Sequence, residues 1–277
     1  MKIKYLGTAA AEGYPALFCQ CERCVEARRL GGKNIRGRAS ALVDGKLLID
    51  FGPDAFTNSI RYNINYTDIK SLLITHIHAD HFQQESIGYR RGPGFAYLTD
   101  AEKLNIYGSP DIATEEMKMY SCADKDMYGY NIRVVKPFES FMAEGYKITP
   151  LKANHGTDNP YIYIIEKDGA ALLYAHDTGI FPEETVEYLK NCGVKFGLVS
   201  LDCTAGTTFI DYDSHMNIPR NLETKDMLLN LGVADENTKF FVNHFSHNGE
   251  NTLYEDMERV AVSHGMHSTY DGLEVEF

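Results

Sequence analysis

The sequence lacks a long apolar segment, a low-complexity stretch and a Pro/Ser-rich linker. No run of about 18 apolar residues is present, and the first seven residues alternate polar and apolar too regularly for a signal peptide. A chain of 277 residues with 44% hydrophobic and 24% charged residues has the composition of an ordinary globular protein. We therefore predict a single cytoplasmic domain of the α/β class, over residues 1–277, without a membrane partner.

Basic residues are scarce as well. Asp and Glu number 39 against 27 Lys and Arg, which gives a formal net charge of −12, and no Lys/Arg-rich arm appears. A surface of this charge repels long polyanions. We therefore expect no nucleic-acid partner. The six cysteines, in a chain without an export signal, indicate metal ligands or reduced thiols and not a disulfide framework.

The most informative stretch is Leu72–His81, an apolar run that ends in three histidines and an aspartate. Imidazole nitrogens and a carboxylate at alternating spacing suit two adjacent divalent ions. The spacing places His76 and His78 on one side of an extended segment, and the following turn can direct Asp80 and His81 towards a second ion. Buried as packing residues, all four would need polar partners, so we predict a metal site.

A second candidate metal site lies near the amino terminus. Cys19, Cys21 and Cys24 have the Cys-x-Cys-x-x-Cys spacing that supplies three corners of a zinc tetrahedron. His247, three residues after His244 and beyond a predicted strand at 239–243, is the candidate fourth ligand. We predict a structural zinc that attaches the amino-terminal loop to the rim of the active site.

Other polar side chains come directly after predicted strands. His155 and Asp177 each end a strand at a turn that contains glycine, which repeats the arrangement of the first motif. Asp50 ends the second strand of a hairpin predicted over 40–50, where it can accept a hydrogen bond from a ligand histidine. Further strands are predicted at 2–6 (an edge strand), 70–74, 104–107, 131–138, 146–152, 160–166 and 170–176, and helices at 22–30, 53–61, 80–88, 110–121 and from 182.

The motif His-x-His-x-Asp-His after a strand resembles the signature of the metallo-β-lactamase superfamily. The resemblance implies a four-layer αββα sandwich. It also implies that His76, His78 and His155 hold a first ion, that Asp80, His81 and His244 hold a second, and that Asp177 bridges both. The expected ions are Mn²⁺ or Zn²⁺.

The start of the chain, the cysteine cluster, the pair His244 and His247, and the ending at 270–275 resemble more narrowly the cyclic phosphodiesterases of the carbon-phosphorus lyase pathway of phosphonate degradation. That family hydrolyses phosphoribosyl 1,2-cyclic phosphate. The resemblance implies a dinuclear phosphodiesterase with a small diester substrate, in which Asp80 and His215 are catalytic and His215 donates a proton to the leaving group. Residues 89–138 look longer here than in that family.

Three other functions share the metal residues: a nuclease of the tRNA 3′-processing kind, a thioesterase or lactamase, and a metal-stabilised binding module without catalysis. The acidic balance disfavours the nuclease. The intact motif disfavours a likeness to an accessory protein of pyrroloquinoline quinone synthesis. Arg90 and Arg91 could bind a substrate phosphate, although the simpler interpretation is that they are solvent-exposed cations in a loop. The oligomeric state is left open, with a homodimer as one alternative, and His264 and His267 receive no role.

Overall fold

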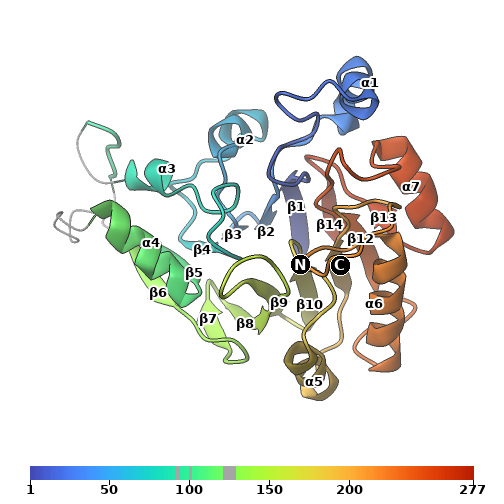
Figure 1. Cartoon of the computed structure of the whole chain (residues 1–277). Helices are drawn as coiled ribbons and strands as arrows, with labels where there is room; N and C mark the ends of the chain where they lie inside the picture. The colour runs from blue at the N-terminus through green and yellow to red at the C-terminus, as the bar shows by residue number, and fades with distance from the viewer. Residues whose placement is uncertain (91–93, 100–101, 121–128) are drawn as a thin grey trace.

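Two β-sheets lie face to face in the computed structural model, which describes residues 1–90, 94–99, 102–120 and 129–277 (Figure 1). In order across the first sheet, its strands are β14 (Glu274–Glu276), β1 (Lys2–Gly7), β2 (Ser40–Val43), β3 (Leu47–Ile49), β4 (Ser71–Leu73), β5 (Leu104–Gly108) and β6 (Tyr130–Val134). Across the second they are β13 (His267–Ser268), β12 (Lys239–Asn243), β11 (Leu198–Asp202), β10 (Ala170–Ala175), β9 (Tyr161–Lys167), β8 (Tyr146–Lys152) and β7 (Phe141–Ala143). Both sheets are mixed, because antiparallel hairpins on one side continue into parallel strands on the other.

The helices are α1 (Glu22–Leu30), α2 (Ala55–Arg61), α3 (Gln84–Gly88), α4 (Pro110–Tyr120), α5 (Glu183–Asn191), α6 (Ile218–Asn230) and α7 (Tyr254–Ser263). Leu189 of α5, Leu228 of α6 and Met257 of α7 pack with the outer face of the second sheet. Ile87 of α3 and Ile112 of α4 belong to the apolar cluster on the outer face of the first sheet. The layers are therefore α, β, β, α, as the sequence predicts.

The central core lies between the sheets. Alternate residues of β1, such as Ile3 and Tyr5, meet the inward side chains of the second sheet, among them Tyr163, Tyr174 and Phe241. Burying a side chain of this size away from water stabilises the fold by about 1.5–3 kcal/mol. The sandwich therefore forms a rigid base, and the loops that leave its strand ends carry the polar chemistry.

The predicted elements hold with some corrections. The hairpin at 40–50 and the helix at 22–30 are confirmed. Strand β1 is not an edge strand, because β14 pairs with it antiparallel. The helix predicted over 80–88 reduces to α3, because residues up to 82 form the turn that presents the histidine motif. Among the described residues, no helix has the length and apolar character that crossing a bilayer requires.

Two glycines allow the strand-end loops to pack tightly beside one another. A Cβ on Gly52 would lie 2.0 Å from the carbonyl oxygen of Asp80, and a Cβ on Gly179 would lie 1.5 Å from that of Asp213. Such separations are far inside van der Waals contact. Only glycine therefore lets the loop after β3 meet the metal motif and the loop after β10 meet the loop that carries His215.

Candidate metal centre

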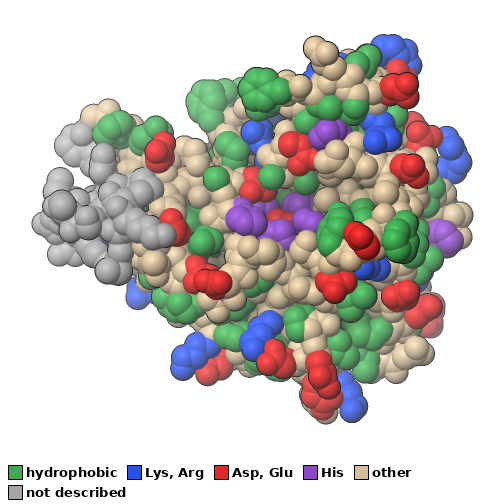
Figure 2. Space-filling model, in the orientation of Figure 1, with side chains coloured by type: hydrophobic (Ala, Val, Ile, Leu, Met, Phe, Trp, Pro, Cys, Tyr) green, Lys and Arg blue, Asp and Glu red, His purple; other side chains and the backbone are tan. Residues whose placement is uncertain are grey.

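The predicted ligands come from four strand ends but occupy one place in the fold. Histidine side chains gather in a hollow at the centre of one face of the molecule (Figure 2). The first sheet supplies the motif after β4, and the second sheet supplies His155 after β8, Asp177 after β10 and His244 after β12. Groups separated by up to 168 positions in the chain therefore converge, because the ends of neighbouring strands meet at one edge of each sheet.

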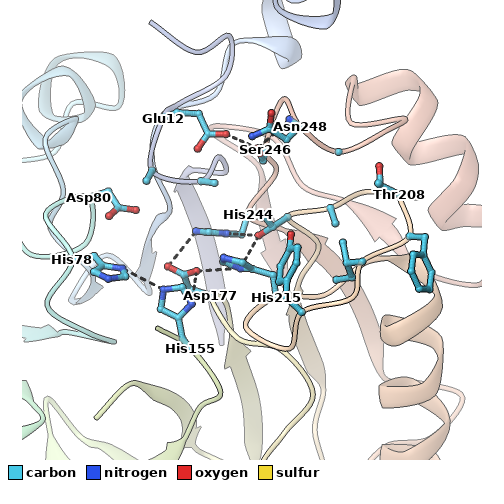
Figure 3. A pocket seen from close by; sticks show the side chains of 18 residues that line it. Glu12, His78, Asp80, His155, Asp177, Thr208, His215, His244, Ser246 and Asn248 are labelled. Carbon is cyan, nitrogen blue, oxygen red and sulfur yellow. Dashed lines mark hydrogen bonds and ion pairs between the residues drawn. The ribbon is translucent and has the colours of Figure 1, made fainter. Parts of the chain in front are cut away.

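Asp177 is the centre of this arrangement (Figure 3). Its carboxylate is 4% exposed, and Oδ2 lies 3.2 Å from His76 Nε2, 3.0 Å from His81 Nε2 and 3.5 Å from His244 Nε2. On its other side Oδ1 lies 3.4 Å from His155 Nδ1. One buried carboxylate thus contacts histidines of both predicted ligand sets.

The ligand atoms fall into two groups in which all of them lie within 4.8 Å of one another. The first group is His76, His78, His155 and Asp177; the second is Asp80, His81, Asp177 and His244. These are the sets that the resemblance implies. A third overlapping group combines Asp177 and His244 with Asp202 and His215. Each set has the size and ligand type of a divalent metal site.

Spacings within the first group fit a cation better than direct hydrogen bonds. His78 Nδ1 lies 2.9 Å from His76 Nε2 and 3.2 Å from His155 Nε2. Three imidazole nitrogens that point at one another repel unless a proton or a cation lies between them. Nitrogens bound at about 2.0–2.1 Å to a tetrahedral ion are roughly 3.3 Å apart, which is close to these distances.

Unpartnered atoms at the centre support the same conclusion. Among the described residues, His81 Nε2, His244 Nε2 and Asp177 Oδ1 are buried and form no hydrogen bond, although each lies 3.0–3.5 Å from an ionisable group of the same cluster. A buried polar atom that lacks a partner is costly. The residues present therefore fit divalent ions.

The backbone at the centre is also held in an unusual conformation. Asp50, Asp177 and His244 adopt positive φ values of 59°, 53° and 65°, each directly after or two residues after a strand. Non-glycine residues rarely occupy the left-handed region, and such strained positions concentrate at functional sites. The turns so formed direct the three side chains towards one point.

Burial and charge oppose each other at the histidines of the second group. Burial disfavours a charged imidazole, but Asp177 and Asp202 outweigh it and raise the pKa of His244 to about 9. Burial is likewise outweighed at His81, where Asp50 and Asp80 raise the pKa well above its usual value. A metal ion must displace these protons, so its binding releases protons and strengthens as the pH rises.

Two carboxylates orient the ligand histidines from behind. Asp50 Oδ2 accepts a hydrogen bond of 2.7 Å from His81 Nδ1, which confirms the predicted contact. Asp202, at the end of β11, lies with Oδ2 3.3 Å from His244 Nδ1 and 3.2 Å from His215 Nδ1. Asp202 has no role among the residues predicted from the sequence, although an acid at the end of a buried strand is the same signal that identified Asp50.

We expect Asp50→Asn to weaken metal binding at the histidine site about 10- to 100-fold, because a neutral amide oxygen accepts a weaker hydrogen bond from His81 Nδ1 than the carboxylate does. Titration with Zn²⁺ or Mn²⁺ in competition with a chelator measures the effect. Asp168→Asn is the matched control, since Asp168 also has a positive φ but lies in the turn between β9 and β10. Equal affinities of the two variants would exclude the orienting role.

Residues 46–234, about two thirds of the chain, match the beta-lactamase superfamily domain family. The chain belongs to the metallo-β-lactamase superfamily. Membership indicates a metal-dependent hydrolase, and the His/Asp clusters are consistent with divalent ions.

Solved structures of the superfamily cover the whole chain. A diphosphatase from the PhnP family superposes with a TM-score of 0.75 at 22% identity, over 100% of this chain and 97% of that one. Zn²⁺-bound PqqB from Methylobacterium extorquens gives 0.68 at 16% identity, over 100% of both chains. Structural similarities at such low sequence identity establish the fold.

A sequence relative gives a further comparison. Ribonuclease Z from Picrophilus torridus is 25% identical over 204 residues, which are 69% of this chain and 57% of that protein. The matched region therefore spans little more than half of the relative's length.

The amino-terminal cysteines form a separate cluster with His247. Its Nδ1 lies 3.4 Å from Cys19 Sγ and 3.6 Å from Cys21 Sγ, and the four ligand atoms including Cys24 Sγ lie within 4.8 Å of one another. A tetrahedral zinc with ordinary Zn–S and Zn–N bonds places these atoms about 3.5 Å apart. Burial raises the pKa of the Cys24 thiol to about 12, whereas at Cys21 burial is outweighed by hydrogen bonds from Cys24 and His247, which lower the pKa to about 6. A bound cation would stabilise the Cys24 thiolate in particular.

Cys21→Ser should remove one zinc per chain and lower Tm by about 5 °C or more, because the loop loses its attachment to His247. Zinc analysis and a thermal scan measure both effects. Cys192→Ser is the control, since Cys192 at the end of α5 is a free thiol outside the cluster. Unchanged zinc content in Cys21→Ser would contradict the proposed site.

A cavity of about 530 Å³ opens above the candidate metal centre. His78, Asp80, His155, Asp177 and His244 form its floor, and the remaining lining comes from three loops, at residues 10–12, 204–215 and 246–249. His215 lies in this lining with its side chain 19% exposed. Its Nδ1 faces Asp202, which leaves Nε2 as the nitrogen that can address a bound molecule.

Arg90, the described member of the predicted arginine pair, does not line this cavity. Arg90 Nε donates to the carbonyl oxygen of Gly129, and Arg90 borders a different, apolar cavity. Arg91 lies outside the described residues, as do parts of the segment 89–138 that looks longer than in the related family (91–93, 100–101 and 121–128).

Proposed function

We propose that the protein is a dinuclear metal-dependent phosphodiesterase that hydrolyses a small phosphodiester. The observation that carries the proposal is the position of Asp177, a buried carboxylate within 3.5 Å of histidines from both ligand groups. Its negative charge, with that of Asp80, would offset half of the charge of two divalent ions in one cavity.

The ligands of each ion come from this chain. His76, His78 and His155 would hold one Mn²⁺ or Zn²⁺, Asp80, His81 and His244 the other, and Asp177 both. When bound, such ions lower the pKa of water and neutralise the negative charge of phosphate oxygens. Asp50 and Asp202 keep the ring nitrogens of His81 and His244 pointed into the site.

The chain also provides a proton donor. Hydrolysis of an alkyl diester produces an alkoxide, which is a poor leaving group unless it receives a proton. His215 lies on the cavity wall 3.3 Å from Asp177, and burial of its ring is outweighed by Asp202, which raises its pKa. His215 Nε2 would therefore protonate the leaving oxygen, and Asp80 would bind the second ion beside the reacting water.

Hydrolysis of a substrate panel by the metal-reconstituted protein tests this function. The panel contains a ribose cyclic phosphate, a linear nucleotide diester, a thioester and a β-lactam, each with Mn²⁺ or Zn²⁺. We expect turnover of at least one diester and none of the carbonyl compounds, and removal of the metals by a chelator should abolish it. Turnover of the thioester or lactam alone would overturn the proposal.

A nuclease of the tRNA 3′-processing kind is the second candidate, because ribonuclease Z is the sequence relative described above. The net charge of −12 opposes it, as does the absence of a Lys/Arg-rich arm. Cleavage of a tRNA precursor, with binding that weakens steeply as salt is added, would favour it over the small diester.

A further inference from the structure

Part of the lining of the cavity above the metal centre, here called the wall, has no role in the proposed reaction. Its lining includes the exposed aromatic rings of Phe209 and Tyr212 and, across the cavity, the carboxylate of Glu12. In Figure 3 Glu12 lies with Ser246 and Asn248 on one side of the metal ligands, and Thr208 lies on another. These groups lie next to the reacting centre, where the remainder of a substrate must bind.

No lysine or arginine belongs to the described lining of the cavity. Asp80 and Asp177 would be offset by bound ions, whereas Glu12 adds a negative charge to the lining; its ion-pair partner, His247, lies outside the lining with Nε2 3.8 Å from Oε1. A second phosphate on the substrate would face this carboxylate at close range in a partly desolvated cavity, and like charges there repel. The cavity therefore disfavours a substrate with a second phosphate, such as phosphoribosyl 1,2-cyclic phosphate.

The aromatic residues indicate what binds in place of a phosphate. Phe209 is 86% exposed and Tyr212 is 45% exposed, although both belong to the cavity lining. The ring of Tyr212 packs edge-on against His215, with centroids 6.2 Å apart. A flat ring stacked on such side chains gains binding energy for any base, since every base has a π-face.

The carboxylate of Glu12 is an acceptor suited to hydroxyl groups. It accepts a hydrogen bond from Ser246 Oγ, and its side chain is 30% exposed. A carboxylate has about four lone-pair positions, so further donors can bind there. A sugar diol supplies such donors without adding charge.

We propose that this wall binds a neutral nucleoside, with its base against Phe209 and Tyr212 and its sugar hydroxyls on Glu12, while the single diester phosphate lies at the metal centre. The inference rests on the proposed phosphodiesterase function, because it takes the phosphate to bind at the histidine cluster. It narrows the substrate to a diester that carries one nucleoside and no other phosphate.

Calorimetric binding to the metal-loaded protein tests the wall without relying on turnover. The probes are methyl phosphate, uridine 5′-monophosphate and uridine 3′,5′-bisphosphate. We expect the monophosphate to bind about tenfold more tightly than methyl phosphate, because of the stacked base. We expect the bisphosphate to bind at least about fivefold more weakly than the monophosphate, because of the charge of Glu12.

Variants assign these effects to the named residues. Phe209→Ala should weaken binding of the monophosphate about tenfold, while Phe56→Ala, an exposed aromatic on α2, should not. Glu12→Gln should reduce the discrimination against the bisphosphate. Tighter binding of the bisphosphate, or equal binding of the monophosphate by wild type and Phe209→Ala, would overturn the inference. If these probes bind as expected and no diester is hydrolysed, the wall stands and the phosphodiesterase function fails.

Discussion

Asp177→Asn is expected to lower kcat/KM for phosphodiesters on the order of 10³-fold or more and to remove metal from the histidine site. The reason is that both candidate ligand groups share this carboxylate, so its loss would disturb both of the proposed ions. Asparagine keeps the side-chain volume and tolerates the positive φ of 53°, which limits the change to charge and ligation. Metal analysis and steady-state kinetics on the same preparation measure the two effects.

Two controls separate ligation from misfolding in this experiment. Asp213→Asn changes a nearby carboxylate that is 76% exposed and pairs with Arg220, so metal content and turnover should remain at wild-type level. The cysteine site of Asp177→Asn should retain its zinc. Full metal content and full turnover in Asp177→Asn would refute the shared-carboxylate site.

His215→Ala is expected to lower kcat about 10²- to 10³-fold for a diester with an alkyl leaving group. The effect should be much smaller for a p-nitrophenyl diester, because p-nitrophenolate leaves without receiving a proton. This dependence on the leaving group distinguishes a proton donor from a general loss of structure.

Metal content decides between two roles for His215. If His215 is only a proton donor, His215→Ala should keep the full metal content. If His215 is a metal ligand in the third group, with Asp202, the variant should contain less metal. His264→Ala is the control, since His264 is an exposed histidine at the end of α7. Equal losses with both leaving groups would exclude proton donation by His215.

The metal motif is a feature that could be predicted from neighbouring residues in the sequence. His76, His78, Asp80 and His81 lie within six residues, so a short apolar strand and a turn bring them together without help from distant parts of the chain. The Cys-x-Cys-x-x-Cys spacing is local in the same sense. Likewise, the hairpin of β2 and β3 and the helix α1 depend on turn residues and glycines within a few positions.

Longer-range features were only partly predicted. The strand that covers β1 comes from the other end of the chain, so the edge position predicted for β1 was wrong. Asp202 contacts His215, 13 positions later, and His244, 42 positions later. Its place at the end of a buried strand marks it as a candidate, as for Asp50, but does not indicate which histidines it meets. Helices α6 and α7, which cover the second sheet, were not anticipated either.

The sequence alone determined the family of this protein, the residue types of both candidate metal sites and the strands that carry them. The two short motifs follow from local spacing, and the remaining ligands follow from the family resemblance that those motifs support. Tertiary structure decided which of those groups meet, that Asp177 joins two sets of histidines, and that Glu12 and the Phe209 loop share one cavity without a lysine or arginine in its described lining. The physical reason is that contacts between distant segments depend on how the two sheets stack and on which strand ends face one another. A local sequence pattern specifies neither.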